Sequence, residues 1–194
     1  MDKLTRSDLY GLEEYARIRP EFRAKVMAHK RNRKVQLGPN MTVHFEDRLT
    51  IQYQVQEMLR TERLFNPEEI EDELDAYNPL IPDGSNWKAT MMIEYAEEQE
   101  RRTALAKLMD IEDRVWVQVA GMDRVYAIAD EDLDRETAEK TSSVHFLRFE
   151  LSPQMARAVK QGAAVGLGCD HPQYKHDISA LPAEVRDSLA ADLG

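Results

Sequence analysis

The 194-residue sequence has a single cysteine, Cys169, and no long apolar run. One cysteine excludes internal disulfides and any CxxC metal or redox motif. A transmembrane helix needs roughly 18 consecutive apolar residues, which no part of this chain approaches. The opening segment, MDKLTRSDLYGLEEYARIRP, also lacks the apolar stretch of a secretory signal. We therefore expect a soluble, cytoplasmic protein that does not contact membranes.

The sequence also lacks an excess of positive charge and any motif that is typical of a known enzyme class. It carries 36 acidic and 26 basic residues, for a formal net charge of -10. Such a balance disfavours nonspecific binding to nucleic acids. No GxSxG, Walker or GxGxxG motif is present. The sequence thus leaves open which cofactor, if any, the protein binds and whether it is an enzyme.

What the sequence does contain is a helical first half and a strand-rich second half. Hydrophobic residues make up 42% of the chain, enough for a sizeable core. Helical spacing and capping signals predict helices, and alternation predicts a hairpin around Gly38-Pro39-Asn40. The expected helices are 9–18, 20–34, 46–63, 67–77, 97–109, 152–162 and 181–193, and the expected strands are 35–37, 41–45, 89–95, 114–119, 124–129, 142–151 and 163–170.

These elements predict an α+β fold. We expect a helical N-terminal half with a β-hairpin, followed by a C-terminal mixed sheet of about five strands with packed helices. Residues 78–87, NPLIPDGSNW, have the composition of an irregular loop. We predict one domain over 1–194. The alternative is a subdivision into a mainly helical part, 1–77, and a sheet-containing part, 88–194, joined by this loop.

Two segments have the character of binding surfaces. Residues 46–63, EDRLTIQYQVQEMLRTER, place glutamines and arginines on the polar face of a helix, where they could bond to the protein's own loops, a partner or a ligand. Loop 78–87 holds polar groups beside stiff prolines, and binding residues concentrate on such loops; a structural strap between the two halves is the alternative. The binding candidates are Arg48, Gln52, Gln56, Glu57, Arg60, Tyr77, Asn78, Asp83, Ser85 and Asn86.

A third segment, residues 17–34, holds eight basic side chains against the single acidic residue Glu21. It could dock on an acidic partner or on phosphates. Alternatively, it lies against the acidic run 68–75 of the same chain or of a second copy. Charge reversal at Arg31 and Arg33 would weaken a docking complex.

The histidines give a weaker indication of a metal site. His145 alternates with Leu147 and Phe149 in SVHFLRFEL, so it is predicted on the apolar face of a strand, where a histidine is more often a hydrogen-bonded core residue than a ligand. A site built from Glu57, Glu62, His145 and His171 is geometrically allowed, although their spacing does not support it. Cys169, on an apolar strand, is expected to be a buried small hydrophobic residue.

Several long runs, in order, resemble a bacterial family known only as domain of unknown function 3501. They are LEEYARIRPEFR, HKRNRKVQLGP, FEDRLTIQYQVQEMLR, ELDAYNPLIPDGSNWKATMMIEY, DRVWVQV, HFLRFELSP and DHPQYKH. The resemblance covers nearly the whole chain and implies one domain, but it brings no activity. Members of the family tend to be encoded beside a rubrerythrin-like protein and an iron–sulfur oxidoreductase subunit. The resemblance therefore implies an accessory role in redox or peroxide defence, by association alone.

The sequence supports two main hypotheses. The first is a non-catalytic cytoplasmic accessory protein that docks on a protein partner, such as an iron–sulfur or rubrerythrin-like redox protein, and that could also form a homo-oligomer. The second is a metal- or small-molecule-dependent enzyme that uses a Glu/His cleft. Nucleic-acid binding through residues 17–34 ranks third.

Overall fold

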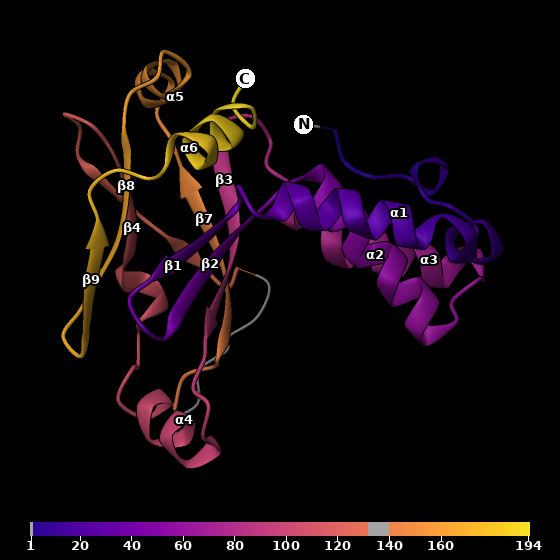
Figure 1. Ribbon diagram of the computed structural model, residues 1–194, viewed down its shortest axis with the longest axis horizontal. Helices are drawn as coiled ribbons and strands as arrows, with labels where there is room; N and C mark the ends of the chain where they lie inside the picture. Colours follow the sequence, from indigo (N-terminus) through magenta and orange to yellow (C-terminus); the bar gives the residue numbers. More distant parts are fainter. Residues whose placement is uncertain (1, 132–139) are drawn as a thin grey trace.

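The computed structural model describes residues 2–131 and 140–194. These residues form two antiparallel sheets and a group of helices (Figure 1). The first sheet has the order β1–β2–β3–β7–β6, and its strands are β1 (Lys34–Leu37), β2 (Met41–Glu46), β3 (Asn86–Ile93), β7 (Val144–Glu150) and β6 (Ile128–Ala129). The second has the order β5–β4–β8–β9, with β5 (Arg124–Tyr126), β4 (Val115–Val119), β8 (Val165–His171) and β9 (Tyr174–Ile178).

The main core lies between the two sheets, because apolar side chains alternate along their strands. Phe45 of β2, Trp87 of β3 and Phe149 of β7 meet side chains of the second sheet such as Val117 and Leu167, and all five are buried. Helices α5 (Pro153–Lys160) and α6 (Ala183–Ala190) lie at one end of this sandwich, and α4 (Glu98–Leu105) lies at the other (Figure 1).

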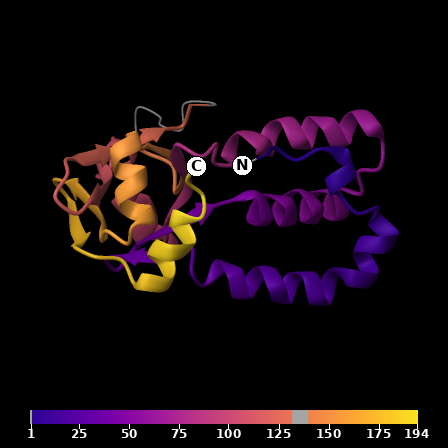
Figure 2. The same ribbon diagram turned by 90° about the horizontal axis from the view of Figure 1, so that it is seen from above.

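Three helices form an arm that extends away from the outer face of the five-stranded sheet (Figures 1 and 2). We call α1 (Leu12–Lys30), α2 (Arg48–Glu62) and α3 (Pro67–Tyr77) the helical arm. Helix α2 packs against both α1 and α3, with one apolar cluster on each side. Asp47 caps α2 by accepting a hydrogen bond from the Thr50 amide at 2.9 Å.

The α+β class is confirmed, but the predicted single mixed sheet is wrong. The strands form two sheets, and every strand pair is antiparallel. The N-terminal hairpin belongs to the same sheet as the C-terminal strand β7, since β2 pairs with β3 in a register that joins Glu46 to Lys88. The sheet therefore crosses the predicted subdivision at 78–87. The subdivision itself remains a prediction.

Two further element predictions are wrong for physical reasons. The helices predicted at 9–18 and 20–34 form one helix, Leu12–Lys30, with Pro20 inside it. Buried Tyr15 and Phe22, on either side of the proline, both pack in the cluster that α1 shares with α2, and this packing holds the helix together across it. Strand β9 was missed because only Tyr174 of its five residues is buried, which leaves no alternation to detect.

Within the described residues, none of the helices combines the length and the apolar character that crossing a bilayer demands. The sequence also predicts a charged connector at 130–140, and residues 132–139 of it lie outside the described residues.

Candidate functional site

His145 lies on the inward face of β7, as its alternation with Leu147 and Phe149 predicted. These three side chains are 0%, 2% and 0% exposed. A polar ring at such a position needs hydrogen-bond partners, because an unpaired polar group in an apolar core costs about 1–3 kcal/mol.

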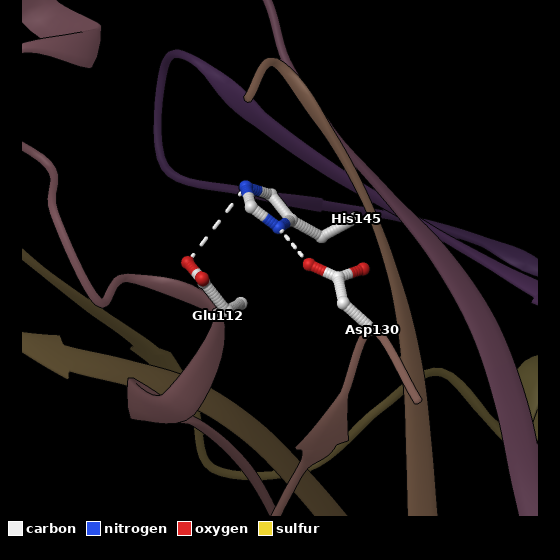
Figure 3. A group of neighbouring side chains, drawn as sticks. All are labelled: Glu112, Asp130 and His145. Carbon is white, nitrogen blue, oxygen red and sulfur yellow. Dashed lines mark hydrogen bonds and ion pairs between the residues drawn. The ribbon is translucent and has the colours of Figure 1, made fainter. Parts of the chain in front are cut away.

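One ring nitrogen of His145 is held by Asp130, which directly follows β6 (Figure 3). Nδ1 lies 2.5 Å from Oδ2 of Asp130 and donates to this carboxylate. The backbone of Phe146 fixes Asp130 in turn: its N–H donates to Oδ1 at 2.9 Å, and its carbonyl accepts from the Asp130 amide at 2.8 Å. Asp130 adopts the left-handed region, with φ 47°, which aspartate tolerates better than most residues. Asp130 is thereby positioned to set the tautomer of His145.

The other ring nitrogen faces oxygen atoms. Nε2 lies 3.0 Å from Oγ1 of Thr141, 3.1 Å from the carbonyl oxygen of Ser142 and 3.7 Å from Oε2 of Glu112. When Nδ1 donates to Asp130, the neutral imidazole presents a lone pair at Nε2. A carbonyl and a carboxylate also present only lone pairs. The Thr141 hydroxyl can donate to only one of these groups. Nε2, the Ser142 carbonyl and the Glu112 carboxylate are therefore all groups that can bind a proton or a metal ion.

Three segments distant in sequence build this group, which we call the carboxylate–histidine cluster: Glu112, Asp130 and His145 (Figure 3). Glu112 opens the short helix η3 (Glu112–Arg114) and is 8% exposed. One ligand atom from each residue lies within 4.8 Å of the others. Among residues 2–131 and 140–194, this is the one group of three potential ligands of this kind.

The sequence prediction found only His145 of this cluster. Glu57, Glu62 and His171 do not join it. Glu57, in the helical arm, accepts hydrogen bonds from the Tyr15 hydroxyl at 2.7 Å and from Arg19. Glu62 is exposed at the end of α2, and Nε2 of His171 lies 2.9 Å from the carbonyl oxygen of Met109. The predicted set of four ligands is therefore not one site.

The contacts of Glu57 predict how the protein responds to acid. Hydrogen bonding to Arg19 lowers the pKa of Glu57 to about 2, below its ordinary value of 4.5. A depressed pKa in the folded state contributes stability above pH 4.5 and loses it as the pH falls toward 2. We expect Glu57→Gln to lower the free energy of unfolding by about 2 kcal/mol at pH 7, after allowance for partial exposure. Urea denaturation should show a smaller difference in the free energy of unfolding between wild type and Glu57→Gln at pH 3 than at pH 7. A difference that does not change with pH would contradict the assignment.

Helix α2, which carries Gln52 and Gln56, holds the N-terminal segment in place. The Gln56 side chain is fully buried, accepts from the Tyr10 amide and donates to the Tyr10 carbonyl. Gln52 donates to the carbonyl of Asp8 at 2.7 Å, and Arg48 pairs with the Asp8 carboxylate at 2.6 Å. The polar face of α2 thus bonds to the protein's own N-terminal segment, which is one of the alternatives predicted for it. Arg60, on the same helix, is exposed.

Loop 78–87 makes similar internal contacts. The Asn78 side chain bonds to both the amide and the carbonyl of Leu4, and buried Asn86 donates to Glu150. Asp83 accepts from the amide and the hydroxyl of Ser85. These bonds support the structural-strap interpretation of the loop. Tyr77, in contrast, lines a cavity and stays a binding candidate.

The basic segment 17–34 is divided between surface and core. Arg31 is exposed, whereas Arg33 is 2% exposed and its guanidinium pairs with buried Asp192 at 2.5 Å. Arg33 therefore does not belong to a docking surface. Helix α2 lies between α1 and α3 (Figure 2), so the acidic run 68–75 of the same chain does not pack against α1.

Cys169 is buried, as predicted, and burial raises the pKa of its thiol to about 11. A thiol in this state is protonated at neutral pH and is a poor nucleophile. The prediction that Cys169 behaves as a small hydrophobic residue agrees with both observations.

The comparisons with other proteins establish a family without an activity. The family described as "Protein of unknown function (DUF3501)" matches residues 3–193. A crystal structure of a protein of unknown function from Burkholderia pseudomallei K96243 is similar over 100% of both chains, with 52% sequence identity and a TM-score of 0.95. No curated protein matches the chain.

Proposed function

Because the chain belongs to the DUF3501 family, whose description gives no activity, we propose a function from the geometry alone: the protein binds a divalent metal ion at the carboxylate–histidine cluster. One observation carries this proposal. Nε2 of fully buried His145 faces the Ser142 carbonyl and the Glu112 carboxylate, while Asp130 holds Nδ1.

The donor set matches a first-row divalent cation such as Zn²⁺ or Mn²⁺. Imidazole nitrogen, carboxylate and carbonyl oxygen are ordinary ligands for these ions. Thr141 and Ser142 approach Nε2 at 3.0 and 3.1 Å, which is the separation of adjacent ligands in a coordination shell with bonds of about 2.1 Å. Asp130 would then act behind the ligand, orienting the ring and raising its basicity, as carboxylates commonly do for metal-bound histidines.

The depth of the cluster favours a structural ion. Glu112, Thr141 and His145 are 8%, 1% and 0% exposed. Structural metal sites are closed in this way, whereas catalytic sites keep a position open to water or substrate. An ion here would tie η3 and the end of β6 to β7.

Metal binding is testable on the purified chain. After treatment with EDTA and dialysis, we expect one Zn²⁺ or Mn²⁺ to bind per chain in isothermal titration calorimetry. Replacing Glu112 by Gln removes one charged ligand while keeping its shape, and we expect affinity to fall about 10- to 100-fold. The matched control is Glu62→Gln, an exposed carboxylate outside the cluster, which should leave affinity unchanged.

Two results would reject the proposal. One is the absence of binding to the folded wild-type chain. The other is equal binding by wild type and Glu112→Gln, which would place the ion elsewhere.

The cytoplasmic location, the accessory role beside an iron–sulfur or rubrerythrin-like redox protein, and homo-oligomer formation stay predictions. No contact among the described residues bears on them. Of the two hypotheses from the sequence, the cluster supports the metal-dependent one, in a form that does not require catalysis.

A further inference from the structure

A cavity lies where the helical arm joins the outer face of the five-stranded sheet. Its volume is about 560 Å³, within the range of small-molecule sites. Met58 of α2, with Tyr77 and Leu80 near the end of α3, forms one wall; Phe146 and Lys88, from neighbouring strands, line the sheet side. The lining is mainly apolar.

A second cavity, of about 290 Å³, adjoins the first. The two share Tyr77, Leu80 and Phe146, and Ile51 and Met92 extend the apolar lining of the smaller one. The smaller cavity also has polar lining residues, among them Lys30, His44 and Gln54. The shared residues Tyr77, Leu80 and Phe146 form an apolar wall in the same cavity as Lys88. An elongated apolar group would fit this wall better than a compact polar one.

In the second cavity, Lys30 lies over the ring of Tyr53, 5.9 Å from its centroid. Of the described residues that line the first cavity, Lys88 is the cation without a carboxylate at ion-pair distance. In the described part of the chain, its ammonium makes no hydrogen bond or ion pair. The neighbouring Arg148 differs, because its guanidinium is bound by Glu131 at 2.8 Å and by Glu150 at 2.6 Å. Glu46, opposite Lys88 on β2, accepts instead from Thr50 and Thr90.

The environment of Lys88 favours a negatively charged ligand. Burial, and secondly the charge of Arg148, lower the pKa of Lys88, and the charges of Glu131 and Asp83 offset only part of this lowering. An anion beside the ammonium would offset both effects. Glu73 and Asp75 on the opposite wall, and Glu131 beside Arg148, would repel a second negative charge. The cavity therefore suits a single carboxylate better than a phosphate dianion.

We propose that this cavity binds a small amphipathic monocarboxylate, with its carboxylate on Lys88 and its apolar chain along Leu80, Tyr77 and Phe146 toward the adjoining cavity. This site is separate from the carboxylate–histidine cluster and goes beyond the proposed metal binding. Either proposal can fail without the other.

Decanoate is a suitable probe, with decyltrimethylammonium as the cation of the same chain length. We expect calorimetry on the full chain to show decanoate binding one to one and decyltrimethylammonium binding at least about tenfold more weakly, because a charge-assisted contact is worth about one to two orders of magnitude in affinity. Lys88→Met keeps the aliphatic stem and removes the charge. It should weaken decanoate binding by about 10- to 100-fold.

The control variant is Lys25→Met, which removes an exposed lysine of α1 remote from the cavity lining. Thermal melting of each variant establishes that it is folded. The proposal is overturned if the folded wild-type chain does not bind decanoate, if it binds the cation equally well, or if Lys88→Met binds decanoate like wild type. Removing divalent metal with EDTA should not change decanoate affinity, which separates this test from the metal proposal.

Discussion

Replacing Arg33 by Met is expected to lower the free energy of unfolding by about 3–5 kcal/mol, the usual cost of breaking a buried ion pair from one side. The guanidinium donates to the carbonyls of Phe45 and Glu46 and to Asp192, joining the hairpin to the C-terminal end of α6. Its loss leaves the Asp192 carboxylate, 3% exposed, without its cation. Urea denaturation at pH 7 measures the change.

The same substitution should respond to pH. Burial raises the pKa of Asp192 to about 6 even with Arg33 present. Without the cation this pKa rises further, so at pH 5 the variant protonates Asp192 and regains part of the lost stability. Arg31→Met, at an exposed position two residues away, is the control and should change stability by less than about 0.5 kcal/mol. Equal stability of the two variants would contradict the assignment.

A double variant separates the charge from the packing. Arg33→Met combined with Asp192→Leu replaces the pair by apolar groups, and such replacements are often neutral. We expect the double variant to be more stable than Arg33→Met alone. This result also bears on docking experiments, since charge reversal at Arg33 would unfold the protein rather than report on a partner.

Trp87→Ala is expected to cost about 3–5 kcal/mol, as large truncations in a packed core do. Trp87 is fully buried between the sheets, in an edge-on contact with Phe45 at 6.3 Å between ring centroids. Its indole N–H donates to the carbonyl of Leu189 at 2.9 Å, which fixes α6 on the sandwich. Urea denaturation at 25 °C and pH 7 is again the measurement.

Trp87→Phe distinguishes the volume of the indole from its hydrogen bond. It keeps an aromatic ring but leaves the buried Leu189 carbonyl without this donor, at a cost of about 1–3 kcal/mol. The expected order of stability is wild type, Phe variant, Ala variant. An Ala variant as stable as the Phe variant would show that the site can collapse around the cavity.

Local patterns in the sequence were enough to predict most helices and strands. Asn66-Pro67 marked the start of α3, and Ser152-Pro153 marked the start of α5, where Ser152 accepts from the Met155 amide. Alternation placed His145 on the inward face of its strand. These patterns could not predict which distant strands pair. Strand β3 pairs with β7, some 60 residues later, and the sequence of neither strand indicates its partner.

The candidate site was hard to predict for the same reason. Glu112 and Asp130 lie in charged stretches of the sequence, where acidic residues are generally expected to be exposed. Only the fold brings them to His145. Gln56 shows the opposite case. Its polar character indicated a binding face, yet it is fully buried against the backbone of Tyr10. A polar residue on a helix therefore predicts a hydrogen bond, but it does not identify the partner.

The register that joins Glu46 to Lys88 makes α2 and α3 an insertion between two adjacent strands. The chain leaves the sheet after β2 and returns at β3 next to the point of departure, so the pairing sets no limit on the length of the excursion. Closing a longer loop costs only about 0.6 kcal/mol for each doubling of its length. This junction is therefore a point at which the protein can gain or lose whole turns of helix, and thereby reshape the wall of the cavity, while the sandwich retains its pairing.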